Sequence, residues 1–244
     1  EAEIAKVTGK PRSAPRGFCP SIEELARFMD AIDGNGLNDD PGRHSALFRY
    51  VIVALNTWAR PEAITDLNVS QQVNFQTGIV DLNPPGRPQN KKHRPTIKLT
   101  DNLRGWLLYW KLEYPIIRGV PGAKHPAGFH GTPLKHIGNA TIKGPAKAAG
   151  IPELTPYTLR HFMATRVRSV SGIPVTREER AIWMGHVDTT YRMTQRYERD
   201  DPEYLDSAKR ATDEILTAMD KLCTTKRLHA PGTSTRGGLT VIEA

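Results

Sequence analysis

Two arginines of the 244-residue chain have the chemistry and the setting to bind a phosphate group. Arg60 follows a largely apolar run and directly precedes Pro61, so it stands where two helices are expected to meet. A guanidinium is a planar fork of donors that fits a phosphate bidentately. Taken alone, an ordinary surface arginine at a helix start is the commoner explanation of Arg60. Arg160 lies three positions after Tyr157, hence on the same helix face, close to candidate core residues. Because an unpaired buried charge is costly, Arg160 requires an acidic partner or a bound phosphate.

A lysine, a histidine and a tyrosine add further candidates. Lys91 lies in the basic loop at residues 89–94, where a lysine can reach a leaving oxygen and donate a proton. A solvated basic turn is the alternative for that loop. His186 follows Gly185, which can end a helix in the left-handed conformation, and a histidine at a helix end is the alternative. Tyr197 falls on the next expected helix, and alone it is explained by a partly buried aromatic side chain.

The elements that would position these residues are mainly helical. A capping box formed by Ser21 and Glu24 starts the first helix, which stops at Gly34. Further helices are expected at residues 43–58, from Pro61, and at 101–113, 136–149, 156–171, 176–184, 189–197 and 202–222. Short strands are expected at residues 73–75, 79–82 and 96–99, whereas residues 115–133 read as loop. This pattern predicts an α+β, mainly α-helical fold with a small antiparallel three-stranded sheet beside the helical core.

Length and composition set the wider frame. Residues 1–19 are expected to be a linker or arm, residues 20–222 one domain, and residues 223–244 a flexible tail that ends in a short strand at 239–242. The net charge of +8 and the pI of 9.6 favour a polyanion as partner. No apolar run approaches the ~20 residues that span a bilayer, and no signal pattern stands at the N-terminus. Two distant cysteines form neither a metal-binding pair nor a disulfide framework, so a cytoplasmic protein is expected.

The order of the candidates along the chain resembles the catalytic domain of the tyrosine recombinase (phage integrase) family. Residues 57–64 are similar to the first-arginine box of that family, and residues 155–165 to its second-arginine box. Residues 184–186 are similar to its Leu-Gly-His box, and residues 196–205 to its nucleophile segment. The resemblance covers residues 20–222, and four boxes occur in the family's order.

The resemblance implies a site-specific recombinase that cuts and rejoins DNA through a 3′-phosphotyrosine intermediate. Arg60 and Arg160 would hold the non-bridging oxygens of the scissile phosphate, and His186 would donate a further hydrogen bond. Tyr197 would be the nucleophile, and Lys91 the general acid, with Lys92 as the fallback. No metal or cofactor is expected, since arginines supply the positive charge. The implied partners are double-stranded DNA and other protomers in a tetramer, without a membrane.

Two positions depart from the family pattern. Tyr157 stands where the second-arginine box usually begins with histidine, and a phenol with a pKa near ~10 is a poor proton acceptor at neutral pH. Tyr157 would then position the phosphate. The spacing from His186 to Tyr197 is longer than usual, which makes Tyr191 a competing nucleophile, although the residues around Tyr197 favour it.

Three other interpretations remain at this stage. One is a catalytically impaired DNA-binding module of the same fold, suggested by Tyr157. A second is a type IB topoisomerase-like enzyme, which shares the chemistry but needs no specific site. A helical regulator with a basic surface is the third, and it leaves the four ordered boxes unexplained. Since the family usually carries a separate N-terminal helical domain, the sequence is expected to be part of a longer integrase.

Overall fold

The protein was analysed as a computed structural model. The structure describes residues 17–33, 45–90, 92–118, 132–186, 202–225, 227–236 and 239–242. For residues 234–236 and 239–242 it describes the backbone alone. In this part of the chain, no helix combines the length and the apolar character that a membrane crossing requires.

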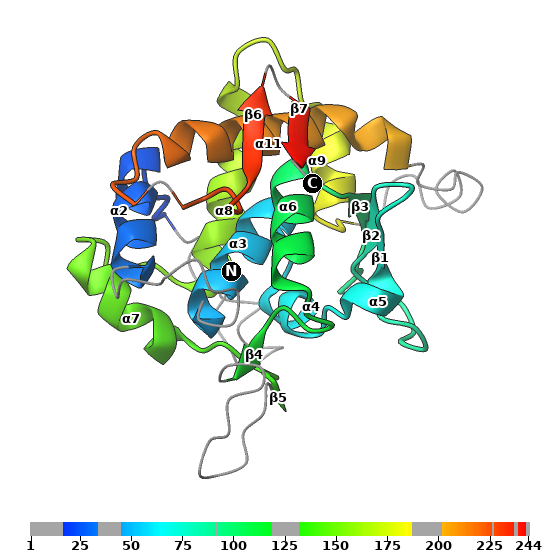
Figure 1. Cartoon of the computed structure of the whole chain (residues 1–244), viewed down its shortest axis with the longest axis horizontal. Helices are drawn as coiled ribbons and strands as arrows, with labels where there is room; N and C mark the ends of the chain where they lie inside the picture. The colour runs from blue at the N-terminus through cyan, green and yellow to red at the C-terminus, as the bar shows by residue number, and fades with distance from the viewer. Residues whose placement is uncertain are drawn as a thin grey trace, which may run out of the picture.

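A buried helix, α3 (Ala46–Thr57), forms the centre of the molecule (Figure 1). Ser45 starts it, because its hydroxyl accepts a hydrogen bond from the Phe48 amide at 3.0 Å. Every residue from Leu47 to the end of the helix is buried, as its continuous apolar run predicts. The helix ends at Trp58, whose φ of 50° lies in the left-handed region. Two residues later Arg60 starts the next helix, so the chain leaves the core directly beside a charged side chain.

The helices that contact α3 are α2 (Ile22–Asp33), α4 (Pro61–Thr65), α6 (Asp101–Trp110), α8 (Pro156–Arg166) and α11 (Asp206–Asp220). Helix α7 (Asn139–Ala148) packs against α2, α9 (Arg177–Trp183) packs against α11, and α5 (Val69–Gln72) leads into the sheet (Figure 1). Local sequence sets several of their starts: the predicted capping box of Ser21 and Glu24 is confirmed by hydrogen bonds of 2.7 and 3.1 Å. Thr155 caps α8 in the same way, which fixes the helix that carries Arg160.

A three-stranded antiparallel sheet lies on the side of the molecule away from α2 and α7 (Figure 1). Its strands are β1 (Val73–Asn74), β2 (Ile79–Asp81) and β3 (Thr96–Lys98), in the order β1-β2-β3. Val80 pairs with both Val73 and Ile97, so the buried residues of the strands share one face. The predicted fold class, mainly helical with a small antiparallel three-stranded sheet, is confirmed.

The structure also differs from the predicted elements. The helix expected at residues 156–171 ends at Arg166 and continues as a 3-10 turn, η2 (Val167–Ser169). The helix expected from residue 202 begins as a 3-10 turn, η3 (Pro202–Leu205). Residues 115–133, expected as loop, contain two short paired strands, β4 (Ile117–Arg118) and β5 (Thr132–Pro133). The helix expected at residues 189–197 lies outside the described residues.

The beginning of the expected flexible tail packs against the core instead. Leu228 is fully buried, and its carbonyl accepts hydrogen bonds from Trp106 Nε1 at 2.8 Å and Asn102 Nδ2 at 2.7 Å. A hairpin of β6 (Thr233–Arg236) and β7 (Leu239–Ile242) follows beside α6 (Figure 1). The missing side chain of Gly105 admits Thr233, because a Cβ there would lie 3.0 Å from it. These contacts involve single side chains and one carbonyl group, so no periodic pattern in the sequence predicts them.

Candidate functional site

Arg160 is the most deeply buried charge of the site, with 6% of the residue exposed. Its Nη1 donates to the Trp58 carbonyl at 2.6 Å, and its Nη2 donates to the Met184 carbonyl at 2.7 Å. Trp58 and Met184 are the C-cap residues of α3 and α9, where helices leave carbonyl groups without helical partners and carry partial negative charge. Of the two partners expected for Arg160, a carboxylate or a phosphate, the described residues do not supply the first, because none of their carboxylates forms an ion pair with it. The carbonyl groups at the two helix ends thus accept hydrogen bonds from the Arg160 guanidinium, but they do not neutralise its charge.

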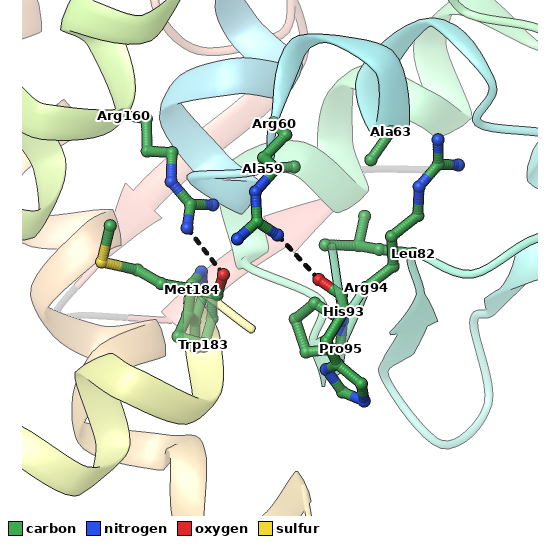
Figure 2. Close-up of a pocket in the computed structure, with 10 residues that line it drawn as sticks. All are labelled: Ala59, Arg60, Ala63, Leu82, His93, Arg94, Pro95, Arg160, Trp183 and Met184. Carbon is green, nitrogen blue, oxygen red and sulfur yellow. Dashed lines mark hydrogen bonds between the residues drawn. The ribbon is translucent and has the colours of Figure 1, made fainter. Parts of the chain in front are cut away.

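Arg60 brings a second guanidinium to the same place (Figure 2). It occupies the N-cap position of α4, and its Nη1 donates to the His93 carbonyl at 2.8 Å. Burial, together with the nearby charge of Arg60, lowers the pKa of Arg160 to about 10. Arg160 therefore stays charged at neutral pH. In the part of the chain that the structure covers, Arg60 likewise has no ion pair with a carboxylate.

The turn at Gly185 brings the end of α9 close to the His93 carbonyl. Its φ is +63°, and the amides of Gly185 and His186 bond back to the Ile182 and Ala181 carbonyls at 2.8 Å each, closing a Schellman motif as the sequence predicted. A Cβ on Gly185 would lie 2.6 Å from the His93 carbonyl oxygen, a distance that real contacts do not allow. The absence of a side chain thus lets the end of α9 touch the same carbonyl that accepts from Arg60.

His186 stands directly after this turn and is only partly exposed to solvent. Its Nε2 lies 3.3 Å from Arg160 Nη2. Because a guanidinium can only donate, Nε2 must accept, and the ring proton of the neutral imidazole then resides on Nδ1. Burial and the charges of Arg160 and Arg60, with a smaller effect of His161, lower the pKa of His186 below its ordinary value. The histidine is therefore neutral at pH 7, and its N–H donor is on Nδ1.

Two tryptophans that sequence reasoning missed lie next to the arginines. Trp183 lines the pocket, and the Trp58 carbonyl accepts a hydrogen bond from Arg160. The rings of Trp58 and Trp183 are both fully buried and lie 5.0 Å apart. Trp183 Nε1 donates to the Thr57 carbonyl at 3.0 Å, which ties α9 to the end of α3. A left-handed non-glycine residue costs ~1–2 kcal/mol, and the contacts of Trp58 offset that strain. The available signal was their spacing: each tryptophan precedes a site residue, Arg60 or Gly185, by two positions.

Arg60 and Arg160 line one small pocket (Figure 2). Arg94, to which the sequence analysis assigned no role, lines it as well. Its guanidinium is turned away from the other two arginines in Figure 2, and its Nη2 lies 2.8 Å from Asp66 Oδ2. Arg94 is thus neutralised by a carboxylate, in contrast to Arg60 and Arg160.

The remaining predicted residues divide into two groups. Tyr157 lies in the first turn of α8, 38% exposed, on the helix face that also carries Arg160. Lys92 is exposed, and its Nζ lies 3.4 Å from Glu62 Oε1. Lys91, Tyr191 and Tyr197 lie outside the described residues. The structure thus brings together the two arginines and His186, and it leaves the positions of the proposed nucleophile and general acid as predictions.

Within the described residues, no group of three or more histidine, cysteine, aspartate or glutamate side chains is arranged to hold a metal ion. The described residues bring two adjacent guanidinium groups to the pocket, with a neutral imidazole beside them. Such a set of donors suits an oxyanion with several acceptor oxygens.

No family model and no curated protein sequence matches the chain. Solved structures do. The Tn1549 transposon integrase in complex with transposon right-end DNA is 13% identical, with 86% of this chain and 69% of that chain covered and a TM-score of 0.50. The XerA recombinase is 18% identical, with 87% and 67% covered and a TM-score of 0.47. A lambda integrase dimer bound to a COC′ core site is 15% identical, with 80% and 64% covered and a TM-score of 0.49.

The chain thus spans about two thirds of the length of these solved chains, and 52% of another lambda integrase chain. At these identities the likeness concerns the fold. The chain has the fold of the catalytic domain of the tyrosine recombinases.

Proposed function

We propose that the chain is the catalytic domain of a site-specific tyrosine recombinase, which cuts and rejoins double-stranded DNA through a 3′-phosphotyrosine intermediate. The observation that carries this proposal is the pairing of Arg60 and Arg160 at one pocket, each held by carbonyl groups and neither by a carboxylate of the described residues. Two like charges held side by side repel each other, and a bound anion relieves that cost. A phosphodiester supplies one negative charge, and its transition state supplies more.

The geometry suits the transition state of phosphoryl transfer. The carbonyls of Trp58, Met184 and His93 fix the two guanidinium groups before a substrate arrives, so little reorganisation is needed on binding. His186 contributes its Nδ1–H to a non-bridging oxygen, because its Nε2 faces Arg160. The neutral imidazole adds a donor without adding a third positive charge to the free site.

The covalent step uses two residues assigned by the resemblance. The phenol of Tyr197 releases its proton to the surrounding water as its oxygen forms a bond to phosphorus, and the bond from phosphorus to the 5′ oxygen of the next nucleotide breaks. Lys91, or Lys92 in its place, gives a proton to that oxygen. The 3′-phosphotyrosine keeps the phosphodiester energy, so attack by a 5′-hydroxyl reseals a strand without ATP.

Tyr157 favours one alternative, a DNA-binding module of the same fold with impaired catalysis. A neutral phenol in the first turn of α8 can donate a hydrogen bond to a phosphate oxygen, but it does not accept a proton readily. Under the recombinase proposal this donor is sufficient. Tyr157→Phe then slows strand cleavage by ~10-fold, the value of about one hydrogen bond to a charged group.

The proposed partners are double-stranded DNA and further protomers, four of which would act on two duplexes. The net charge of +8 supports the first. The Tn1549 integrase was solved on transposon right-end DNA, which offers a guide to how this chain would sit on its own site. Cys19 and Cys223 form no disulfide with each other, which is compatible with a reducing cytoplasm.

The test uses a pool of nicked duplexes with randomised sequence, in which the released strand cannot religate. The proposal expects an SDS-resistant protein–DNA adduct that enriches particular sequences, is lost in Tyr197→Phe and persists in Tyr191→Phe. DNA binding without an adduct would support the impaired module and contradict the recombinase. Relaxation of supercoiled plasmid without sequence enrichment would instead support a topoisomerase-like enzyme.

A further inference from the structure

Lys98, at the end of β3, forms two ion pairs with the region just after the proposed nucleophile segment. Its Nζ lies 2.8 Å from Glu203 Oε2 and 3.5 Å from Asp206 Oδ1. The lysine side chain is only 14% exposed, whereas the two carboxylates are 75% and 56% exposed. Burial alone lowers the pKa of Lys98, but the two carboxylates outweigh it and raise the pKa above its ordinary value. The two ion pairs therefore hold the Lys98 ammonium group against the junction of η3 and α11, where Glu203 and Asp206 lie.

A second charged group fixes the same helix start from another element. Leu205, the N-cap residue of α11, provides no side-chain cap. Glu179 of α9 takes that role, because its buried carboxylate accepts from the Ala208 amide at 3.1 Å. The same carboxylate accepts from the Thr176 amide at 3.3 Å and so caps its own helix. The start of α11 is therefore attached to two other elements. One is α9, which is followed by His186, and the other is β3, which follows the loop that contains Lys92.

The ion pairs of Lys98 are expected to affect the position of η3 more than the stability of the fold. Ion pairs with exposed carboxylates contribute little to folding stability, because water screens them. The same pairs fix which part of the sheet η3 contacts. Tyr197 precedes Pro202 by five positions, and five extended residues reach at most ~18 Å. The docking of η3 therefore limits where the Tyr197 phenol can lie, and a displacement of ~1 Å in a reacting group can cost ~100-fold in rate.

We propose that Lys98 is a positioning residue for strand cleavage: its ion pairs with Glu203 and Asp206 hold η3 on the sheet and thereby hold the nucleophile segment at the arginine pocket. This inference rests on the function proposed above. Lys98 itself touches neither the phosphate nor the leaving oxygen. It acts through the chain that it anchors.

The chain offers a closely matched control in Lys209. Its side chain is 20% exposed, and its Nζ lies 2.8 Å from Asp101 Oδ2 and 3.7 Å from Asp213 Oδ2. The pair with Asp101 attaches α11 to the start of α6, and the pair with Asp213 lies within α11, so neither of them involves η3. Lys98→Met and Lys209→Met thus each remove one largely buried ammonium group that forms two ion pairs, the first from β3 and the second from α11. They differ in whether η3 loses its attachment to β3.

The experiment measures single-turnover adduct formation on the nicked duplexes selected by the wild-type chain, with DNA affinity and thermal unfolding measured in parallel. Lys98→Met is expected to slow adduct formation ~10- to 100-fold at saturating DNA, with affinity unchanged. Lys209→Met is expected to stay within ~2-fold of wild type in that rate, whatever its effect on the melting temperature. The exchange Lys98→Glu with Glu203→Lys restores the pair and is expected to recover much of the rate.

A substrate with sulfur in place of the 5′ bridging oxygen separates positioning from proton donation. Because a thiolate leaves without a proton, the substrate rescues a variant that lacks its general acid. Lys98→Met is expected to remain slow on it, whereas Lys91→Ala recovers. Three outcomes overturn the inference: a wild-type rate for Lys98→Met, equal slowing of both methionine variants, or rescue of Lys98→Met by sulfur. Failure of the wild-type chain to form a Tyr197 adduct would instead overturn the proposed function.

Discussion

The guanidinium of Arg160 donates to the carbonyl of Trp58 at 2.6 Å, and Trp58 stands two residues before Arg60. One junction, between α3 and α4, therefore sets the positions of both arginines. Its left-handed residue turns a free carbonyl toward α8, and the next turn of the chain presents Arg60 to the same pocket. Residues 100 positions apart in sequence are thus coupled through the backbone, without a contact between two side chains.

This relationship separates the effects of the two arginines. Arg160→Lys leaves one of two buried carbonyls without a donor, so it is expected to lower the free energy of unfolding by ~1–3 kcal/mol and to slow adduct formation by ~100-fold or more. Arg60→Lys changes a half-buried residue and is expected to slow adduct formation similarly, with a stability change below ~1 kcal/mol. Urea unfolding and single-turnover cleavage measure the two quantities. Equal stability losses in both variants would contradict the carbonyl anchoring of Arg160.

Gly185 supports a prediction with an internal control. Gly185→Ala places a Cβ 2.6 Å from the His93 carbonyl, in a residue with φ of +63°. It is expected to cost ~2–4 kcal/mol and to slow cleavage, since it displaces the acceptor of Arg60. Gly172 has φ of +75° with nothing within 4 Å of a Cβ, so Gly172→Ala carries the backbone strain alone, ~1 kcal/mol. Thermal unfolding of the two variants compares them. If they melt alike, the close approach to His93 is not what requires the glycine.

Local sequence was sufficient to predict the secondary structure that frames this site. Ser21 and Glu24 cap α2, Gly185 ends α9, and the strand pattern gives the sheet, since each of these rests on neighbours in sequence. The carbonyl partners of Arg160 could not be predicted in this way. A backbone carbonyl leaves no mark in the sequence, and the expected alternatives were a carboxylate or a phosphate. The packing of Leu228 onto α6 escaped prediction for the same reason.

His186 makes stability and ligand binding depend on pH in a defined direction. Its folded-state pKa is lowered by burial and by Arg160, so the native state binds fewer protons than the unfolded state between that pKa and the ordinary value of 6.5. Its contribution to stability is therefore present above pH 6.5 and is lost as the pH falls through the folded-state pKa. Melting temperatures of wild type and His186→Gln should diverge less at acidic pH than at pH 7.5.

The same residue reports on an anion in the pocket. A phosphate or vanadate bound between Arg60 and Arg160 places negative charge near the imidazole, which favours its protonated form. Nitrogen NMR of the histidines is expected to show the Nδ1–H tautomer in the free protein and a higher His186 pKa on addition of vanadate. A pKa that stays constant at saturating vanadate would place the anion elsewhere.

Tyr50 tests the rule that buried polar groups need partners. The residue is fully buried in α3, and among the described residues its hydroxyl has no hydrogen-bond partner. Burial, with a smaller effect of Tyr157, raises the pKa of this phenol well above its ordinary value. Tyr50→Phe removes an unpaired hydroxyl and leaves the ring, so it is expected to preserve or raise the free energy of unfolding, by up to ~1 kcal/mol.

Thr212 supplies the contrast, because its buried hydroxyl donates to the Ala208 carbonyl at 2.7 Å. Thr212→Val keeps the shape of the side chain but removes this hydrogen bond, and it is expected to lower the free energy of unfolding by ~1 kcal/mol. Urea denaturation of both variants at pH 7.5 compares their free energies of unfolding with that of the wild type. A loss of stability in Tyr50→Phe as large as that in Thr212→Val would mean that the Tyr50 hydroxyl is hydrogen-bonded in solution. An ordered water beneath Tyr157 would then be the partner to seek, since it would connect the core to the first turn of α8.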